Sequence, residues 1–412
     1  MTSLLRTLLL LAALGPLCAS AAGGGPKPYK AQYRAQFEPQ TGLIKVELKL
    51  SGERLPSKLV LRMDPKRYRS ISSTDALKVE ESSVTWRPQG KFSRLKYDFV
   101  IDHQRSPGAY DSLARSDWAL FRGDKLVPRA KVTALRGLES RASIEFVLPQ
   151  GWSVVTPYAP AGTKVVHFSD PDRRFDRPEG WMLAGKLGSR TELIAGIQAI
   201  VAAPTGDSAR RQDMLSFLNW NLPHLAEVFP NFPRRLLIVS AGDPMWRGGL
   251  SGPASLFLHA GRPLISENRT STLLHELIHV AMSIHGDAES DWIVEGFAEF
   301  YSIETLRRSG GISSQRHAEA LDKLATWGER TVSLFAQRSA GSRTARAVVT
   351  LKAADDEIRR LTGGKASLDD VARELAAHHG QVSLKMLQAI AAKVAGRPLQ
   401  SLERSRLSGA AS

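Results

Sequence analysis

The segment Thr272–Val280 constrains this chain more than any other stretch, because it contains the pattern H-E-x-x-H. On a helix, residues four apart share one face, so His275 and His279 can direct two imidazole nitrogens at one metal ion. Neutral imidazoles suit zinc, and zinc lowers the pKa of its bound water to about 7. Glu276 is placed to accept a proton from that water as a general base. The alternative is a chance match on an ordinary amphipathic helix, and a third ligand would decide between the two.

Two residues are candidates for the third ligand. His285 follows His279 at the metzincin spacing, but Met282 stands where that class needs a glycine for a sharp turn. We therefore expect the helix to continue and to carry His285 away from the site. Glu295 would begin a second helix, and an antiparallel return after a short loop would bring its carboxylate to the histidine pair. Since two histidines and one glutamate form a known catalytic zinc set, we predict one zinc ion held by His275, His279 and Glu295.

Two further carboxylates lie on the helix predicted to carry Glu295. Glu299 and Asp291 are candidates to orient the ligand imidazoles through their ring N–H groups. The alternative for both residues is a solvated helix face.

Strand-like alternation of apolar and polar residues dominates the first half of the chain, in segments separated by proline, glycine and serine. The predicted strands cover residues 29–37, 43–50, 58–63, 83–86, 95–101, 131–135 and 142–148. No long helical period precedes residue 208, so we predict a β-sandwich-like N-terminal domain.

Helical periodicity dominates the second half. The predicted helices cover residues 209–228, a segment from about 270 that carries the motif, a segment from Asp291, and residues 345–361, 368–379 and 384–394. Residues 235–240 are predicted to form a strand. The glycine-rich segment 246–258 is predicted to be a loop that leads into an edge strand, and residues 264–265 are predicted to extend that strand. The chain is thus predicted to be multidomain α+β: signal peptide 1–22, β domain 23–205, mainly helical metal-binding domain 206–310, helical part 311–405 and disordered tail 406–412.

The N-terminus has the pattern of a secretory signal peptide, with one basic residue, a leucine-rich run and small residues before Ala21 and Ala22. We predict cleavage near these alanines and export to a periplasm or the medium. The apolar run is too short to span a bilayer, and no later segment is apolar for long enough. Lipidation at Cys18 is the alternative, although Leu17 stands where a small residue is expected. Because Cys18 is the only cysteine, disulfides and thiolate ligands are excluded from the mature chain.

The chain is basic, with 56 Lys and Arg against 41 Asp and Glu, a net charge of +15. The basic residues are scattered, without a dense block or an aromatic-interleaved stripe. This distribution favours a solvated basic surface and argues against a nucleic-acid partner. The oligomeric state is left open.

Several segments together resemble one class of peptidase. The motif at 275–279, followed by Trp292–Ala298, looks like the gluzincin arrangement of aminopeptidase N and its relatives. The glycyl aminopeptidase family, related to the tricorn-interacting aminopeptidases, is the closer match. Its similarity extends to Phe146–Trp152, to the glycine-rich Gly248–Leu250, and to the helical segments 355–360 and 367–371.

The resemblance implies an N-terminal β domain, a thermolysin-like catalytic domain and a helical C-terminal part, without the PDZ module that many members carry. It implies a peptide or protein substrate. His275, His279 and Glu295 match the zinc ligands of the family, and Glu276 matches its general base.

Two positions depart from the family pattern. In these families a glutamate on the glycine-rich strand binds the free amine of the substrate, but Ser251 follows Gly248, Gly249 and Leu250 here. A neutral hydroxyl cannot supply that charge-assisted contact, so both aminopeptidase and endopeptidase specificity stay open. We expect the backbone of residues 248–251 to pair with an extended substrate as an added strand.

The second departure concerns the oxyanion. The families use a tyrosine from a later helix, but no tyrosine follows Tyr301, and the comparable stretch offers Arg343 and Arg346. The sequence therefore predicts an exported zinc metallopeptidase. The alternatives are a catalytically weak, zinc-containing binding protein and a hydrolase of non-peptide amides or esters.

Overall fold

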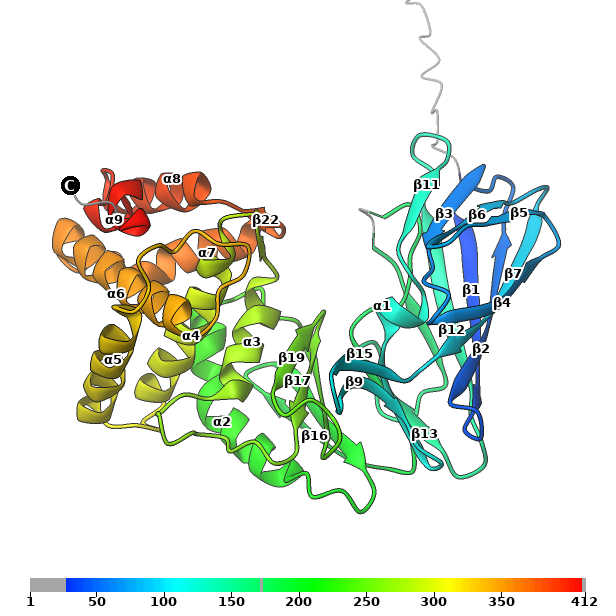
Figure 1. Cartoon of the computed structure of the whole chain (residues 1–412), viewed down its shortest axis with the longest axis horizontal. Coiled ribbons are helices and arrows are strands. Elements are labelled where there is room, and N and C mark those ends of the chain that lie inside the picture. Colours follow the sequence, from blue (N-terminus) through cyan, green and yellow to red (C-terminus); the bar gives the residue numbers. More distant parts are fainter. Residues whose placement is uncertain (1–26, 171–172, 410–412) are drawn as a thin grey trace, which may run out of the picture.

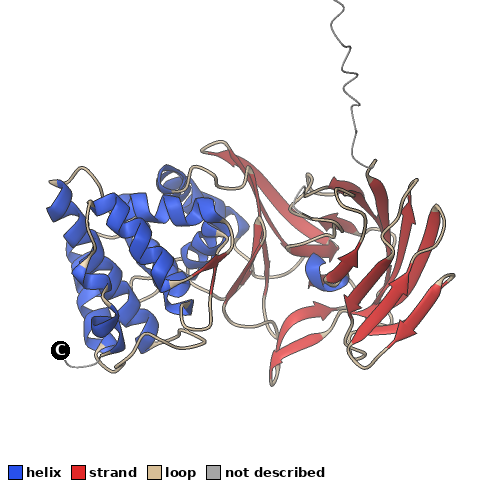
Figure 2. Cartoon of the chain, turned by 90° about the horizontal axis from the view of Figure 1, so that it is seen from above, coloured by secondary structure: helices blue, strands red, loops and turns tan. Residues whose placement is uncertain are grey.

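The structure is a computed structural model that describes residues 27–170 and 173–409. The molecule is elongated, with strands gathered at one end and helices at the other (Figures 1 and 2). The predicted signal peptide, with Cys18 and the cleavage region at Ala21 and Ala22, lies outside the described residues. Within the described ranges, no helix is long and apolar enough to cross a membrane.

The first sheet forms the outer part of the strand-rich end. It consists of β1 (Tyr29–Glu38), β2 (Leu43–Ser51), β4 (Tyr68–Ser73), β7 (Phe92–Val100), β12 (Ser140–Val147) and β14 (Val165–Phe168), in the order β14-β12-β1-β2-β7-β4. Tyr29, Ala31, Tyr33 and Ala35 are buried while the residues between them are exposed. The period of two that predicted this strand therefore reflects one buried and one solvated face.

Two smaller sheets complete the N-terminal half. One contains β3 (Lys58–Arg62), β5 (Ala76–Val79), β6 (Ser83–Arg87) and β11 (Ala130–Thr133), in the order β11-β3-β6-β5. The other contains β8 (His103–Ser106), β9 (Ala109–Ala114), β10 (Trp118–Arg122), β13 (Ser153–Val155) and β15 (Trp181–Gly185), in the order β13-β15-β10-β9-β8. The helix α1 (Gly123–Leu126) follows β10. The strand β15 was not predicted, because all its residues are buried and its sequence therefore lacks the alternation of apolar and polar residues.

The fourth sheet belongs to the half that carries the motif. It consists of β16 (Leu187–Ile194), β17 (Ile197–Pro204), β18 (Arg235–Ala241), β19 (Gly249–Gly252) and β20 (Ser255–His259), in the order β16-β17-β18-β20-β19. Because β17 pairs with β18 in parallel, this sheet runs across the boundary predicted at residue 205. Residues 264–265 do not extend an edge strand, contrary to expectation, since no strand is formed there.

The two halves are joined by a shared apolar layer. Leu113, Leu120 and Trp181 of the N-terminal half pack in one buried cluster with Leu237 and Phe257 of the fourth sheet. All five side chains are fully buried, so separating the halves would expose a large apolar area. The sheet containing β8 and β9 is therefore held in place against the sheet that ends at β19.

The helices of the second half are α2 (Arg211–Val228), α3 (Thr272–Met282), α4 (Asp291–Arg308), α5 (Ser314–Gly328), α6 (Ser342–Thr362), α7 (Leu368–His378), α8 (Leu384–Ala395), the 3-10 helix η1 (Gln400–Leu402) and α9 (Arg404–Ser408). The strands β21 (His285–Gly286) and β22 (Gln381–Val382) form a small parallel pair. A capping box at Ser367 begins α7, where a helix was predicted over residues 368–379.

The tail predicted to be disordered is partly ordered. Residues 404–408 form α9, Leu407 is buried, and its carbonyl accepts a hydrogen bond from the Leu334 amide at 3.0 Å. The burial of Leu407 orders this segment. The prediction of disorder was wrong here, because a single apolar residue in a short polar segment does not reveal that it will be buried. Residues 410–412 lie outside the described part.

Candidate metal centre

The helix α3 presents the histidine pair from a rigid position. The Ser271 hydroxyl caps the helix by accepting a hydrogen bond from the Leu274 amide, and Ser283 ends it in the left-handed conformation with φ 48°. The Ser302 hydroxyl of α4 accepts from the Ser271 amide at 3.2 Å and donates to the Ser271 carbonyl at 3.1 Å. The start of α3 is therefore tied to the middle of α4, the helix that carries Glu295.

The three predicted ligands converge. The Nε2 atoms of His275 and His279 are 3.1 Å apart. One oxygen of Glu295 lies 3.4 Å from Nε2 of His275, and the other lies 3.5 Å from Nε2 of His279. No other group of three or more His, Cys, Asp or Glu residues suited to a metal ion occurs in the described ranges.

These distances fit a zinc ion. Ligand atoms at about 2.0–2.1 Å from a tetrahedral zinc are roughly 3.3 Å apart, which is close to the three separations here. Two imidazole nitrogens and one carboxylate also match the donor set of catalytic zinc sites. The residues present therefore fit the metal implied by the motif.

Burial and neighbouring charges shift the pKa values of the residues in this cluster. Burial favours a neutral His275, but hydrogen bonds to Glu295 and Glu299 outweigh it and raise the His275 pKa to about 10. Burial, followed by the charge on His275, lowers the His279 pKa to about 4. Burial favours a neutral Glu295, but its hydrogen bond to His275 and the two histidine charges lower its pKa. A bound cation would replace the proton on His275.

Of the two carboxylates proposed to orient the ligands, only Glu299 contacts a ligand. Its Oε2 lies 3.0 Å from Nδ1 of His275, which directs the opposite Nε2 at the centre. Asp291 instead accepts a hydrogen bond from the Ser339 amide at 2.6 Å, so it holds the segment before α6. The sequence could not separate the two because both lie on the same helix as Glu295.

Replacing Glu299 is expected to weaken zinc binding without abolishing it. Glu299→Ala removes the partner of the His275 Nδ1–H group, and such losses cost about 10- to 100-fold in metal affinity. Competition with a fluorescent zinc chelator measures the change. Glu289→Ala is the matched control, because Glu289 is exposed and pairs with Arg404 instead. An unchanged affinity in Glu299→Ala would contradict this role.

His285 is not part of the ligand group, although the reason differs from the one predicted. The helix α3 ends at Met282 and does not continue to His285. His285 lies in β21, where its amide donates to the Gly380 carbonyl at 3.0 Å. It lines the same cavity as the histidine pair, but the three-residue ligand group excludes it.

Glu276 lies beside the ligands in a buried position. It is 8% exposed and accepts hydrogen bonds from the hydroxyl and the amide of Ser251. Burial raises the Glu276 pKa above its ordinary range, although the charge of His275 and the bonds from Ser251 oppose the shift. A carboxylate with a raised pKa is a better proton acceptor, as general-base chemistry requires.

Because Gly249 of β19 has no side chain, the Glu276 side chain can pack directly against it. A Cβ atom added at Gly249 would lie 2.5 Å from Cγ of Glu276 and 2.9 Å from Cγ2 of Thr272. A side chain at this position would therefore force Glu276 or the strand to move. Gly249 was predicted to pair with the substrate, and the structure also gives it this packing role.

If the chain is the hydrolase that its motif predicts, Gly249→Ala is expected to lower the hydrolytic rate about tenfold or more and to leave the zinc content unchanged, because displacing a catalytic group by about 1 Å costs up to about 100-fold. Steady-state kinetics with parallel metal analysis measures both quantities. Gly252→Ala on the same strand is the control, since its added Cβ would meet only atoms at 3.4 Å or beyond. Equal rates in the two variants would show that Glu276 tolerates the displacement.

Comparison with solved structures identifies the fold. An aminopeptidase N family protein from Idiomarina loihiensis matches with a TM-score of 0.66 at 15% identity, covering 85% of this chain and 70% of that one. An M1 zinc metallopeptidase from Deinococcus radiodurans matches with a TM-score of 0.55 at 16% identity, covering 93% and 94%. The chain has the fold of the M1 zinc metallopeptidases. Leukotriene A4 hydrolase from Saccharomyces cerevisiae also matches, with a TM-score of 0.51 at 14% identity, covering 89% and 65%.

No protein-family model and no curated protein matches the sequence. The assignment of the M1 fold thus rests on structural similarity. This similarity confirms the predicted resemblance to gluzincin peptidases and the multidomain α+β class. The thermolysin-like character of the second half stays a prediction.

The two arginines expected near an oxyanion serve elsewhere in this M1 fold. Arg343 donates to the carbonyls of Ser333 and Arg338, and Arg346 donates to those of Val332 and Arg406, among others. Neither lines the cavity of about 350 Å³ at the metal centre. Both hold the loops before α6 and at the C-terminus, so neither is placed to stabilise an oxyanion at the metal centre.

Two residues of the N-terminal half support the glycine-rich strand. Arg122 of β10 donates to the Ser251 carbonyl at 3.0 Å, and Trp181 of β15 donates through its indole N–H to the Leu250 carbonyl at 2.7 Å. The Arg122 guanidinium also lies over the Trp181 ring. Neither role was predicted, because the partners are more than sixty residues apart in the sequence.

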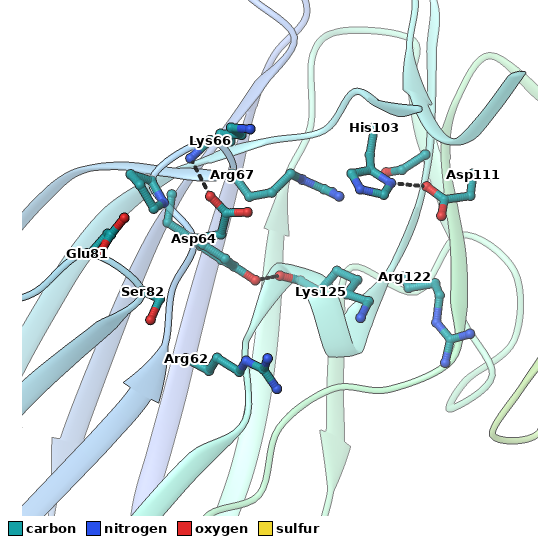
Figure 3. Close-up of a pocket in the computed structure, with 13 residues that line it drawn as sticks. Arg62, Asp64, Lys66, Arg67, Glu81, Ser82, His103, Asp111, Arg122 and Lys125 are labelled. Atoms are coloured by element: carbon teal, nitrogen blue, oxygen red, sulfur yellow. Dashed lines mark hydrogen bonds and ion pairs between the residues drawn. The ribbon is translucent and has the colours of Figure 1, made fainter. Parts of the chain in front are cut away.

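Arg122 also lines a larger cavity, of about 770 Å³, in the N-terminal half (Figure 3). Basic and acidic side chains surround this cavity, including Arg62, Lys125, Asp64 and Asp111. None of the three metal ligands lines it, so it is separate from the metal centre.

Proposed function

We propose that the protein is a zinc metallopeptidase. The observation that carries the proposal is the convergence of His275, His279 and Glu295 at ligand distances, with the buried carboxylate of Glu276 next to them. The M1 fold supports it, because the similar structures from Idiomarina loihiensis and Deinococcus radiodurans are described as an aminopeptidase N family protein and a zinc metallopeptidase.

Each residue has a distinct part in this mechanism. A single zinc ion, when bound, supplies a polarised water and a Lewis acid for the substrate carbonyl. Glu276 accepts a proton from the attacking water and delivers it to the leaving amine. Ser251 keeps the Glu276 carboxylate in place through two hydrogen bonds. Glu299 keeps His275 oriented through its Nδ1 atom.

The glycine-rich strand is the proposed binding edge for the peptide. The strand β19 lies at the end of its sheet, so one side of it is open to an added strand. At Ser251, however, the amide is bound to Glu276 and the carbonyl to Arg122. We therefore expect the substrate backbone to pair with Gly249 rather than with Ser251.

Peptide libraries with free and with acetylated N-termini test the proposal. We expect the zinc-loaded protein to cleave both libraries, because the neutral Ser251 offers no charge to select a free amine. A chelator should abolish cleavage and added zinc should restore it, with products identified by mass spectrometry. Cleavage of free N-termini alone would establish a strict aminopeptidase.

Failure to cleave either library would refute the peptidase proposal. Retained zinc and peptide binding would then favour the catalytically weak binding protein, and hydrolysis of amide or ester model compounds would favour a non-peptide hydrolase.

We further propose that the protein is exported, on the pattern of residues 1–22. Fractionation of cells with an antibody, comparing the full chain with a version lacking these residues, tests that point.

A further inference from the structure

One positive charge in the metal-centre cavity has no part in the mechanism above. Arg105 of β8 lines this cavity together with Ser251, Glu276 and Glu295. It is the only lysine or arginine among the residues that line it, and its side chain is exposed. The N-terminal half thus contributes a cation to a site whose other residues come from the second half.

The position of Arg105 is determined by hydrogen bonds between the halves. The β8–β9 hairpin is joined to the loop before β19, because the Tyr110 amide donates to the Pro244 carbonyl at 3.0 Å and the Trp246 amide donates to the Tyr110 carbonyl at 2.8 Å. The Tyr110 hydroxyl in turn accepts from the Gln104 side chain at 3.1 Å. The residue next to Arg105 is therefore tied to the loop that leads into the binding edge.

The guanidinium of Arg105 is available to a ligand. It lies over the Trp246 ring, 5.4 Å from the centroid, and forms no ion pair with any carboxylate in the described residues. A guanidinium that contacts a ring through its face keeps its N–H donors free at the edge. Those donors have the spacing that binds a carboxylate with two parallel hydrogen bonds.

The carboxylates of the cavity are engaged elsewhere. Glu295 contacts the two histidines, Glu276 contacts Ser251, and Asp291 accepts from the Ser339 amide. Among the Lys, Arg, Asp and Glu residues that line the cavity, Arg105 alone forms no hydrogen bond or ion pair within the described residues. A carboxylate of the substrate would therefore meet a free cation there, next to the neutral side chain of Ser251.

We propose that Arg105 determines specificity by binding a carboxylate of the peptide substrate. The carboxylate is either an acidic side chain near the scissile bond or the C-terminus of the peptide. This inference rests on the proposed peptidase function, but it concerns binding and can be measured without turnover.

Calorimetry with the zinc-loaded Glu276→Gln variant of the full chain tests the proposal. The ligands are acetylated alanine-based peptides with one Glu or one Gln at each position in turn, each made as the C-terminal acid and as the amide. We expect at least one Glu peptide, or the acid form, to bind about tenfold or more tightly than its neutral counterpart, since hydrogen bonds to charged groups have that strength. The side-chain and C-terminal series distinguish the two sources of the carboxylate.

Adding Arg105→Gln to this variant should reduce the preference to less than about twofold. Arg115→Gln is the matched control, because Arg115 is exposed near the same hairpin, carries the same charge and does not line the cavity. Its preference should stay unchanged. In a second variant, Arg105→Glu, the preference should turn toward peptides with lysine at the same position.

Three outcomes would overturn the proposal: equal affinity for charged and neutral peptides, a preference that survives Arg105→Gln, or no measurable peptide binding. If Arg105 instead served the oxyanion, Arg105→Gln in the active protein would lower kcat equally for all peptides and leave the affinity ratio intact. Failure of the peptidase function has a different signature, the absence of zinc-dependent cleavage by the unaltered protein.

Discussion

Glu276→Gln is expected to lower the rate of peptide hydrolysis about 100- to 10,000-fold while zinc content stays the same. Glutamine keeps the size and the hydrogen-bonding oxygen of the side chain, so its bonds from Ser251 and its packing against Gly249 can persist. It cannot accept the proton of the attacking water or pass it to the leaving amine. The loss should therefore appear in kcat with little change in KM.

The measurement combines kcat and KM for one cleaved peptide with metal analysis of the same preparation. Glu267→Gln is the control, because Glu267 is exposed in the loop before α3 and carries the same charge. An active Glu276→Gln variant with full zinc occupancy would show that another group acts as the base.

Glu295→Ala is expected to weaken zinc binding by about a thousandfold and to abolish activity at ordinary zinc concentrations. Zinc sites bind with about 10–16 kcal/mol, so one of three protein ligands accounts for roughly 4 kcal/mol, equivalent to about a thousandfold. The two oxygens of Glu295 lie 3.4 and 3.5 Å from the histidine nitrogens. The ligand group contains no other carboxylate that could replace Glu295.

Zinc content after dialysis against a chelator buffer measures this loss. His285→Ala provides the control, since His285 lines the cavity but lies outside the ligand group. Retention of zinc by Glu295→Ala together with its loss from His285→Ala would reverse the assignment of the third ligand.

The short-range features of the chain could be predicted from the sequence because they depend on neighbours within a few residues. The four-residue spacing of His275 and His279 places them on one face of any helix, and Glu276 follows from the same geometry. The capping box at Ser367 and the helix end at Gly363 have equally local causes, a side-chain hydrogen bond and a left-handed residue.

Features that depend on packing could be predicted only in part. The spacing of Glu295 suggested an antiparallel return, but its carboxylate reaches the histidines because Ser302 ties α4 to the start of α3. Glu299 and Asp291 were equal candidates on one helix, and only the position of α4 against its neighbours turned Glu299 to His275 and Asp291 to Ser339.

The sequence by itself determined the helix that carries His275 and His279, the position of Glu276 beside them and the family resemblance, since all three follow from short, locally encoded patterns. Only the tertiary structure decided that β17 pairs with β18 in one sheet, how the glycine-rich strand is supported, and that Arg105 enters the metal-centre cavity. Arg105 precedes the motif by more than a hundred residues. It reaches the site because two sheets bury their apolar faces against each other, and no short-range pattern encodes that pairing.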